Sequence, residues 1–490
     1  MKNYLFVLLL IISITTFSQT KIGIDIDGEE IGDQSGISVS LSFDGSIVAI
    51  GSENNNGNGE NSGHVRVYEN ISGNWIQIGS DIDGEATYDF SGNSVSLSSD
   101  GSIVAIGAVN NNGSGSGSGH VRVYENILGN WVQIGSDING EAAGDTSGIS
   151  VSLSSDGSIV AIGAFNNDGS GSNSGHVRIY QYILERWIQI GLDIDGEAAG
   201  DQSGWSVSLS SNGSIVAIGS INNNGNGENS GHVRIYENIS GNWVQIGSDI
   251  DGEAAGDKSG WSISLSSNGN IIAIGAVGVD ENGINSGHVR VYENISGNWI
   301  QIGTDINGEG SYDFSGRSVS LSSDGSVVAI GAQNNDGNGK NSGHVRIYQY
   351  ILGNWVQIGL DIDGEAEDDL SGRSISLSSN GKTVAIGASN NDDNGQDSGH
   401  VRVYDLSAVL SSNSFTLSQF KIYPNPTKNQ FTIQLQEGIQ LEKVSIYNQL
   451  GQLISSTKTN YMDTKNISQG IYFVEVITNK GKSTKKLIIE

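Results

Sequence analysis

The seven histidines of this chain recur at a fixed spacing of 56 residues. Each lies in the sequence SGHVR, followed by Val or Ile and then Tyr. A constant period of this length indicates a repeat architecture, in which every period is one supersecondary unit that packs on its neighbours. The histidines are His64, His120, His176, His232, His288, His344 and His400.

Each period contains four short runs that are typical of β-strands. In one repeat they are Trp131–Gly135, Ser150–Ser154, Ile159–Ala164 and His176–Tyr180, and Asp-Gly, Asn-Gly and Gly-Ser turns separate them. Alternating β-branched runs bounded by turn residues predict an all-β fold. Four strands per period are typical of the blades of a β-propeller. An open β-solenoid of seven repeats is the alternative.

The strand count predicts how the ring closes. The run beginning with Trp appears six times, from Trp75 to Trp355, whereas the other three runs appear seven times. The segment Lys21–Ile26 (KIGIDI) can supply the missing strand to the last repeat. Such pairing removes the exposed sheet edges that invite aggregation. We therefore expect a seven-bladed propeller of four-stranded blades over residues 21–404.

The repeat resembles a known family. The segment 147–180, SGISVSLSSDGSIVAIGAFNNDGSGSNSGHVRIY, is similar to the FG-GAP repeat of integrin-like β-propellers, and six more copies cover the rest of residues 21–404. The leading Phe of that pattern is present only at Phe90 and Phe314, and the family's DxDxDG loop is absent. The resemblance therefore implies the fold more strongly than a function.

The N-terminus and the composition constrain the location of the protein. Residues 1–19 contain Lys2 and an apolar run, Tyr4–Ile14, which together predict a signal peptide cleaved near Ser18–Thr20. The run is too short for a membrane anchor, and no later segment is apolar enough to span a bilayer.

The chain has no cysteine, which excludes disulfides, thiolate metal sites and an acylated N-terminal cysteine. The formal charge of −30 disfavours DNA or RNA as a partner.

The C-terminal segment differs in composition. Residues 405–420 are expected to form a linker, and residues 421–490 hold nine lysines against five acidic residues and alternate with period two. This pattern predicts a small β-sandwich. Its ordered motifs resemble the type A C-terminal sorting domain of type IX secretion substrates. The matching residues are Tyr423, Pro424, Asn425, Pro426, Gly451, Gly470, Lys485 and Lys486.

The sorting-domain resemblance implies a location and a partner. It implies export by the type IX machinery of a Gram-negative bacterium. The domain is then removed, and the protein is either released or linked to lipopolysaccharide.

A second recurring pattern, D-x-[D/N]-G-E followed by another acid, is a candidate calcium site. Oxygen ligands at alternate positions around a glycine turn suit Ca²⁺. The alternative is that these side chains only stabilise Asx and Asp-Gly turns, and two copies carry Asn139 or Asn307 in place of the second Asp. The candidate ligands are Asp25, Asp27, Glu29 and Asp33, and in another copy Asp193, Asp195, Glu197 and Asp201.

Other repeated residues are expected to be structural. A histidine present in every repeat serves the blade rather than one active site, and the repeated Trp is expected to pack between blades, with sugar stacking as the alternative. The loops 54–61 and 334–341, rich in Asn and Gly, are solvated connections or a recognition surface.

Positions that break the repeat are where an individual function is expected. Trp205 and Trp261 replace residues such as Ile149, and Arg317 and Arg373 occupy the same position in later repeats. We take these four as candidate binding residues. The sequence favours a secreted binding or adhesion propeller with a glycan or protein ligand, without enzymatic activity. A structural surface or matrix component, or a propeller hydrolase or lyase, is the alternative.

Overall fold

The computed structural model describes residues 18–412, 420–435, 439–448, 452–465, 467–478 and 481–490. They divide into two units, of which the larger spans Thr20–Ser407 and the smaller includes Gln419–Glu490. The expected signal peptide lies almost entirely outside the described residues. Apart from the helix α1 (Ser407–Ser412), the elements are strands, so the predicted all-β class is confirmed.

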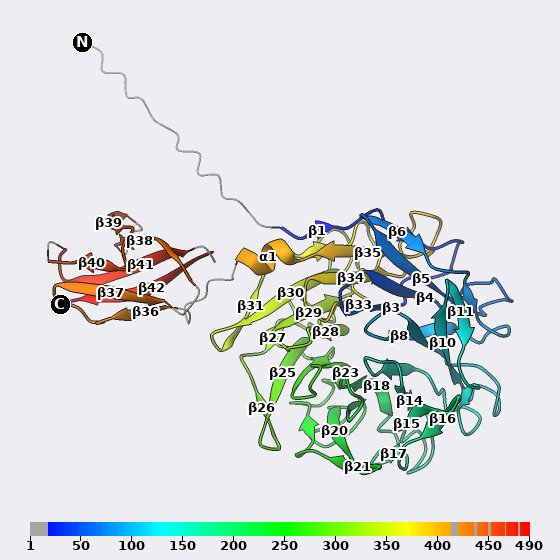
Figure 1. Ribbon diagram of the computed structural model, residues 1–490. Coiled ribbons are helices and arrows are strands. Elements are labelled where there is room, and N and C mark those ends of the chain that lie inside the picture. Colours follow the sequence, from blue (N-terminus) through cyan, green and yellow to red (C-terminus); the bar gives the residue numbers. More distant parts are fainter. Residues whose placement is uncertain (1–17, 413–419, 436–438, 449–451, 466, 479–480) are drawn as a thin grey trace. The chain divides into compact units, whose positions relative to one another are not determined.

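The larger unit consists of seven antiparallel sheets that follow one another along the chain (Figure 1). Each has a path of four strands and a fifth strand of two residues, which pairs with the third; the four strands are in sequence order in six of the sheets. The repeated four-stranded sheets are those expected from the sequence. The short fifth strand was not predicted, because a two-residue run carries no alternating pattern.

The first strand of each sheet has the sequence Ser-Val/Ile-Ser-Leu at its end. These strands are β3 (Ser38–Leu41), β8 (Ser91–Leu97), β13 (Ser150–Leu153), β18 (Ser203–Leu209), β23 (Ser259–Leu265), β28 (Ser318–Leu321) and β33 (Ser374–Leu377). The second strands carry the buried IVAIG sequence and its variants. They are β4 (Ile47–Ser52), β9 (Ile103–Ala108), β14 (Ile159–Ala164), β19 (Ile215–Ser220), β24 (Ile271–Ala276), β29 (Val327–Ala332) and β34 (Thr383–Ala388).

The third strand of each sheet begins with the repeated histidine. These strands are β5 (His64–Ile71), β10 (His120–Ile127), β15 (His176–Ile183), β20 (His232–Ile239), β25 (His288–Ile295), β30 (His344–Ile351) and β35 (His400–Asp405). The fourth strands contain the repeated Trp. They are β6 (Asn74–Gln77), β11 (Asn130–Gln133), β16 (Arg186–Gln189), β21 (Asn242–Gln245), β26 (Asn298–Gln301) and β31 (Asn354–Gln357).

The short fifth strands follow the fourth ones. They are β7 (Ile82–Asp83), β12 (Ile138–Asn139), β17 (Ile194–Asp195), β22 (Ile250–Asp251), β27 (Ile306–Asn307) and β32 (Ile362–Asp363). The seventh sheet takes its last two strands from the N-terminus, namely β1 (Thr20–Lys21) and β2 (Ile26–Asp27).

The ring closes as the strand count predicted. β1 and β2 both pair antiparallel with β35, with Thr20 opposite Asp405 and Ile26 opposite Val401. Each first strand also contacts the first strand of the next sheet, and β33 contacts β3. The first strands therefore surround a common axis, which is the arrangement of a β-propeller rather than an open solenoid.

Serine side chains connect neighbouring first strands around this axis. Ser40 Oγ accepts a hydrogen bond from the backbone N–H of Leu97 in the next sheet, at 3.0 Å. Ser94 Oγ donates to the carbonyl oxygen of Gly148, at 2.7 Å. Equivalent bonds recur around the ring. Serine alternates with Val and Leu in these strands for two reasons. Its side chain is small enough for the narrow space between the strands, and its hydroxyl forms hydrogen bonds with backbone groups of the next sheet.

The repeated Trp and Arg also join each sheet to the one before it. Trp131 Nε1 donates to the carbonyl oxygen of Ile78 at 2.8 Å, and Arg122 donates to that of Asp83 at 2.7 Å. The Arg122 guanidinium lies 5.5 Å from the centre of the Tyr124 ring. These contacts support the prediction that the repeated Trp packs between blades.

The remaining described parts of the chain modify the expected boundaries. The interval 405–420 holds the last residue of β35, the helix α1 and the first residue of β36, so it is partly regular. The smaller unit has a three-stranded and a four-stranded sheet, ordered β36-β37-β40 and β39-β38-β41-β42. Its strands are β36 (Phe420–Tyr423), β37 (Gln430–Leu435), β38 (Leu441–Tyr447), β39 (Leu453–Thr457), β40 (Tyr461–Asp463), β41 (Gly470–Thr478) and β42 (Gly481–Ile489).

In the parts of the chain that the structure describes, no helix is long and apolar enough to cross a membrane.

Two isoleucines of the closing segment give a matched test of ring closure. Ile26 is 5% exposed and packs against Val401, whereas Ile24 is 82% exposed. We expect Ile26→Ala to lower the free energy of unfolding by about 2–4 kcal/mol, because it leaves a cavity in a packed core. Ile24→Ala should change it by less than about 0.5 kcal/mol. Urea unfolding followed by circular dichroism measures both, and equal effects would contradict the closure model.

Candidate functional site

One residue position in each repeat faces the axis at one end of the ring and varies between repeats. Ile37, Asn93, Ile149, Arg317 and Arg373 line a common hollow, although they come from five different sheets. Trp205 and Trp261 hold the same position in the two remaining sheets. The four binding residues that the sequence singled out therefore belong to one rim around the axis.

Aromatic side chains form a continuous row on one side of this rim. Phe165 meets Trp205 edge to face, with ring centres 5.1 Å apart, and Trp205 lies 5.0 Å from Trp261. The two tryptophans are partly buried. Trp261 Nε1 is buried and has no hydrogen-bond partner. The row offers ring surfaces to a ligand.

Two cations lie against Trp261 and continue the rim. The Arg317 guanidinium lies 5.0 Å and the Lys258 ammonium 5.6 Å from the Trp261 ring centre. Arg317 Nε donates to Gln333 Oε1 at 3.0 Å. Burial, with a smaller contribution from neighbouring Arg373, lowers the pKa of Arg317 to about 10, so it stays charged at neutral pH. This is a local positive region in a chain whose formal charge is −30.

Arg373 extends the positive region toward the next sheet. Burial lowers its pKa, while the nearby Glu53 carboxylate raises it. Glu53 in turn accepts a hydrogen bond from the Asn93 amide. Arg373 Nε is buried without a hydrogen-bond partner. The Arg373 Nε–H group therefore has no hydrogen-bond acceptor in the described part of the folded chain.

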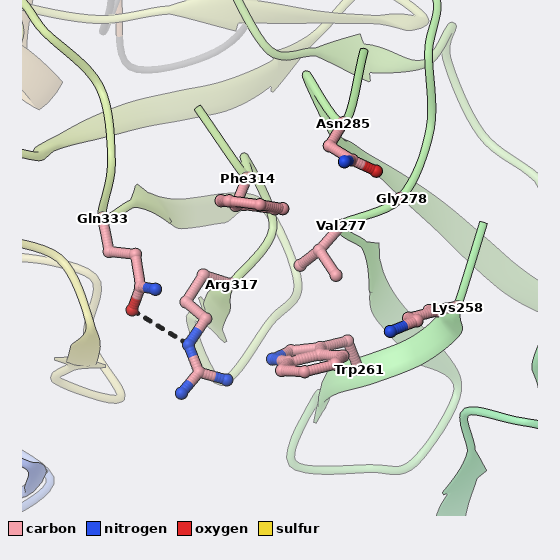
Figure 2. A pocket seen from close by; sticks show the side chains of 8 residues that line it. All are labelled: Lys258, Trp261, Val277, Gly278, Asn285, Phe314, Arg317 and Gln333. Atoms are coloured by element: carbon pink, nitrogen blue, oxygen red, sulfur yellow. Dashed lines mark hydrogen bonds between the residues drawn. The ribbon is translucent and has the colours of Figure 1, made fainter. Parts of the chain in front are cut away.

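The tryptophan and the first arginine line a pocket of about 420 Å³ between the fifth and sixth sheets (Figure 2). Figure 2 shows the Arg317 guanidinium beside the Trp261 ring, with the Phe314 ring above them in this view. No histidine or carboxylate is among its lining residues. These are Lys258, Trp261, Val277, Gly278, Asn285, Phe314, Arg317 and Gln333.

A local change in the fifth repeat accompanies this pocket. Gly278 stands where the other repeats have an asparagine, such as Asn110. Asn110 uses its amide to bond the carbonyl oxygen of Tyr88. A Cβ on Gly278 would lie 1.9 Å from the carbonyl oxygen of Gly256, so only glycine fits this backbone path. The pocket is therefore lined by bare backbone at this point.

Several residues of the site were not predicted. Lys258 and Phe314 occupy one repeat position, and Phe165, Val277 and Gln333 occupy another. Both positions vary between repeats, as the tryptophan position does. A comparison of the seven repeats, position by position, could have found them. It could not show that positions 16 and 19 residues apart meet at one rim.

The candidate calcium ligands do not gather as the sequence suggested. In the first copy, Asp25 bonds Lys21 at 2.8 Å and belongs to a group around His400 in the last sheet. Glu29 instead belongs to a group around His64 in the first sheet. Asp193 and Glu197 diverge in the same way, toward His176 and His232. The D-x-D-G-E pattern therefore supplies ligands to two different sheets.

The other acids of the pattern serve the backbone. Asp33 is fully buried and accepts hydrogen bonds from the N–H groups of Glu29 and Glu30 and from the Asn55 amide. Asp201 similarly accepts from Ala198 and Asn223. Asp27 and Asp195 lie in the short strands β2 and β17 with exposed side chains. These observations match the turn interpretation of Asp33 and Asp201.

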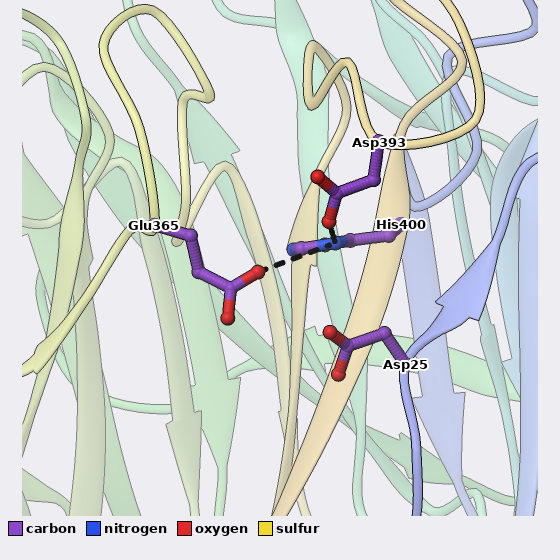
Figure 3. A group of neighbouring side chains, drawn as sticks. All are labelled: Asp25, Glu365, Asp393 and His400. Atoms are coloured by element: carbon purple, nitrogen blue, oxygen red, sulfur yellow. Dashed lines mark ion pairs between the residues drawn. The ribbon is translucent and has the colours of Figure 1, made fainter.

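Each repeated histidine is buried beneath acidic side chains. His176 Nδ1 lies 3.8 Å from an oxygen of Asp193 and 3.9 Å from an oxygen of Glu141. Burial, followed by the charge of the adjacent Arg178, lowers the pKa of His176 to about 4, so the imidazole is neutral at pH 7. The same arrangement recurs around the ring, which fits a role in the blades. The group around His400 has one acid more, and Figure 3 shows it.

Substitution of Asp201 separates the turn and calcium interpretations. Asp201→Ala leaves the Ala198 N–H and the Asn223 amide without their buried acceptor, which should cost about 1–3 kcal/mol of unfolding free energy. Asp195→Ala removes an exposed carboxylate and should cost much less. Denaturant unfolding in Ca²⁺ and in EGTA measures both. A loss for Asp201→Ala that appears only in Ca²⁺ would favour a calcium site.

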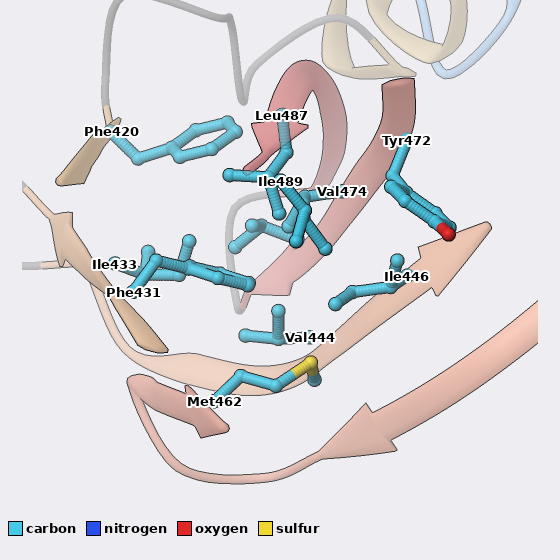
Figure 4. Packing of buried hydrophobic residues seen from close by; sticks show 11 residues of the cluster. Phe420, Phe431, Ile433, Val444, Ile446, Met462, Tyr472, Val474, Leu487 and Ile489 are labelled. Carbon is cyan, nitrogen blue, oxygen red and sulfur yellow. The ribbon is translucent and has the colours of Figure 1, made fainter. Parts of the chain in front are cut away.

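The expected sorting motif lies on the smaller unit, whose core contains Phe420, Phe431, Val474 and Leu487 (Figure 4). Asn425 fixes the motif to the last strand, because its amide donates to the Lys486 carbonyl oxygen at 2.8 Å and its oxygen accepts from the Ile488 N–H at 3.0 Å.

The other motif residues are placed as follows. Lys485 donates to the carbonyl oxygen of Phe420 at 2.5 Å. Tyr423 is 75% exposed, and Gly470 begins β41. Pro424 and Pro426 flank Asn425. Gly451 lies outside the described residues.

Two family models match parts of this chain. The FG-GAP repeat matches residues 307–348 and 360–404, and the secretion system C-terminal sorting domain matches residues 421–490. The propeller therefore contains FG-GAP repeats, and the C-terminal unit is a type IX sorting domain. The chain is a substrate of the type IX secretion machinery that is secreted or attached to the cell surface.

Other similarities are partial or distant. A protein of Nonlabens ulvanivorans described as ulvan lyase NLR42 is 39% identical over 89 residues, which cover 17% of this chain and 16% of that protein. Hydrazine synthase of Kuenenia stuttgartiensis shares the fold with a TM-score of 0.51 at 11% identity, over 79% of this chain and 98% of that one. A 6-phosphogluconolactonase-like structure of Bacteroides uniformis has a TM-score of 0.48 at 15% identity, over 67% and 85% of the two chains.

Proposed function

We propose that the propeller is a non-enzymatic recognition module that binds an anionic polysaccharide outside the cell. The rim built from Trp205, Trp261, Arg317 and Arg373 is the binding site. The observation that carries the proposal is the row of aromatic rings beside three cations, at the one end of the ring where the repeats differ. Secretion places this rim where extracellular and cell-surface glycans are found.

The chemistry of the rim selects the ligand class. Flat aromatic surfaces contact the apolar face of a sugar ring, and a guanidinium donates two parallel hydrogen bonds to a carboxylate or sulfate. The net acidity of the rest of the chain repels anions, so an anionic ligand is drawn specifically to this positive region. A neutral glycan would offer Arg317 no anionic partner.

The residues that line the Trp261 pocket do not supply the carboxyl pair of a glycoside hydrolase, which favours binding over hydrolysis. Polysaccharide hydrolysis needs a pair of carboxyl groups near the cleaved bond. None of the residues that line the Trp261 pocket is a histidine or a carboxylate. The ulvan lyase similarity covers too little of either chain to transfer that activity to the propeller.

Binding to dextran sulfate, with unsulfated dextran as the matched neutral polymer, tests the proposal. We expect the secreted protein to bind dextran sulfate and not dextran. Arg317→Gln and Trp261→Ala should each weaken this binding about tenfold or more, because each removes a charge-assisted hydrogen bond or a stacking surface. Biolayer interferometry measures the dissociation constants.

Ile149→Ala is the control, because Ile149 holds the same repeat position two sheets away from Trp261 and three from Arg317, and contributes neither an aromatic ring nor a charge. It should leave binding within about twofold of the original protein. Added NaCl should weaken the interaction through screening. Equal binding to both polymers, or variants that bind as well as the original, would refute the proposed site. Polyuronate, tested in parallel, distinguishes carboxylate from sulfate recognition.

A further inference from the structure

Four metal-ligating side chains meet where the N-terminal strands close the ring. Asp25 lies between β1 and β2, Glu365 follows β32, Asp393 lies in the loop between β34 and β35, and His400 begins β35. One ligand atom from each lies within 4.8 Å of the others. Figure 3 shows the carboxylates of Glu365 and Asp393 directed toward the imidazole, with Asp25 nearby on the other side.

The imidazole is directed into the cluster without a hydrogen-bond partner. His400 Nδ1 lies 3.9 Å from an oxygen of Asp393 and 4.0 Å from an oxygen of Glu365. These distances are too long for hydrogen bonds. They are close to the separation of about 3–4 Å between two ligands that each bind one ion at about 2.1 Å. The His400 side chain is 0% exposed, and both of its ring nitrogens are unpaired.

The fourth ligand distinguishes this cluster from its equivalents in most other repeats. Asp393 stands where five other repeats have glycine, at Gly57, Gly113, Gly169, Gly225 and Gly337. The fifth repeat has Glu281 at this position, and its carboxylate accepts a hydrogen bond from the Asn307 amide. In four of the repeats with glycine the corresponding cluster holds three ligands, namely one Glu, one His and one Asp. The last repeat therefore adds a carboxylate at the only seam where the sheet is completed by a distant segment.

We propose that Asp25, Glu365, Asp393 and His400 bind one first-row divalent transition-metal ion, such as Zn²⁺ or Mn²⁺. An imidazole nitrogen with carboxylate oxygens suits these ions, whereas Ca²⁺ and Mg²⁺ are bound by oxygen ligands alone. This site differs from the candidate calcium set, of which it includes only Asp25. It is also separate from the proposed polysaccharide rim and does not depend on it.

Two cations already balance part of the negative charge. Lys21 pairs with one oxygen of Asp25 at 2.8 Å, and Arg402 lies 3.6 Å from one oxygen of Glu365. Glu365 directs its other oxygen toward His400. Three carboxylates, two cations and one divalent ion give a net charge of about +1, so binding an ion does not require either pair to break.

A metal ion here would fasten the closing segment to the last sheet. The β1 and β2 strands pair with β35 over only two residues each. Coordination of Asp25 together with residues of the last sheet adds a bond between them. The ion would therefore stabilise the closed ring at its weakest connection.

Asp393→Gly removes the fourth ligand and restores the residue found in most other repeats, so the variant is expected to fold. The mature chain is treated with EDTA, dialysed, and titrated with Zn²⁺ and separately with Mn²⁺ by isothermal calorimetry. We expect one tight binding event in the original protein and at least about tenfold weaker binding in the variant. Weaker binding by the three-ligand clusters would be the same in both proteins.

Asp392→Asn is the matched control, since it removes the same charge from the adjacent residue and asparagine occupies that position in Asn56 and Asn112. It should bind the ion as the original protein does. Hydrogen exchange of residues 20–27 should slow on adding the ion to the original protein and the control, but not to Asp393→Gly. No tight binding of either ion, or unchanged affinity in Asp393→Gly, would overturn the proposal.

Discussion

The convergence of seven strands on one axis is the constraint on which this propeller depends. Little space remains between neighbouring sheets there. A Cβ on Gly51 would lie 2.0 Å from the carbonyl oxygen of Gly92 in the next sheet, and the equivalent Gly107 is limited in the same way by Gly148. Serine is the side chain that fits beside these glycines and still bonds across the gap, as Ser40 does with the Leu97 N–H. Backbone N–H groups at the Leu end of the strands also donate to the next sheet, as Ser99 does to Ser155. The repeat is nearly invariant because the same crowding recurs at every step.

This uniformity determines where an individual function can arise. A side chain inside a sheet packs against both neighbouring sheets, so a substitution there must fit both of them. A side chain at the end of the axis contacts only the neighbouring residues of the rim. Position 37 and its equivalents show the result, since they change from isoleucine and asparagine to tryptophan and arginine around one ring. The row from Phe165 through Trp205 and Trp261 to Arg317 uses one residue from each of four sheets. A nearly uniform set of repeats therefore carries one asymmetric surface.

Sequence patterns predicted most of the fold because strands and turns are local. The four runs of each repeat, and the closure by residues 21–26, followed from alternation and from counting. The candidate binding residues were found because they break the repeat. The acidic pattern was harder, since Asp25 and Glu29 lie four residues apart but belong to groups in different sheets. Between these two residues the chain passes from one sheet to the next. Their spacing in the sequence cannot show to which of the two sheets each side chain belongs. The same limit hid Asp393, whose partners Asp25 and Glu365 come from both ends of the propeller sequence.

The closing segment begins directly after the signal peptide that the sequence predicts. Thr20 is the first residue of the described ladder and pairs with Asp405, and Lys21 next to it bonds Asp25. A mature chain that begins at Thr20, as cleavage near Ser18–Thr20 would leave it, keeps the whole closing segment. Loss of β1 would leave the outer edge of β35 unpaired at Tyr404 and Asp405, while β2 would still pair with Val401 and His400. The cleavage position predicted from the sequence therefore lies directly before the strand that completes the last sheet.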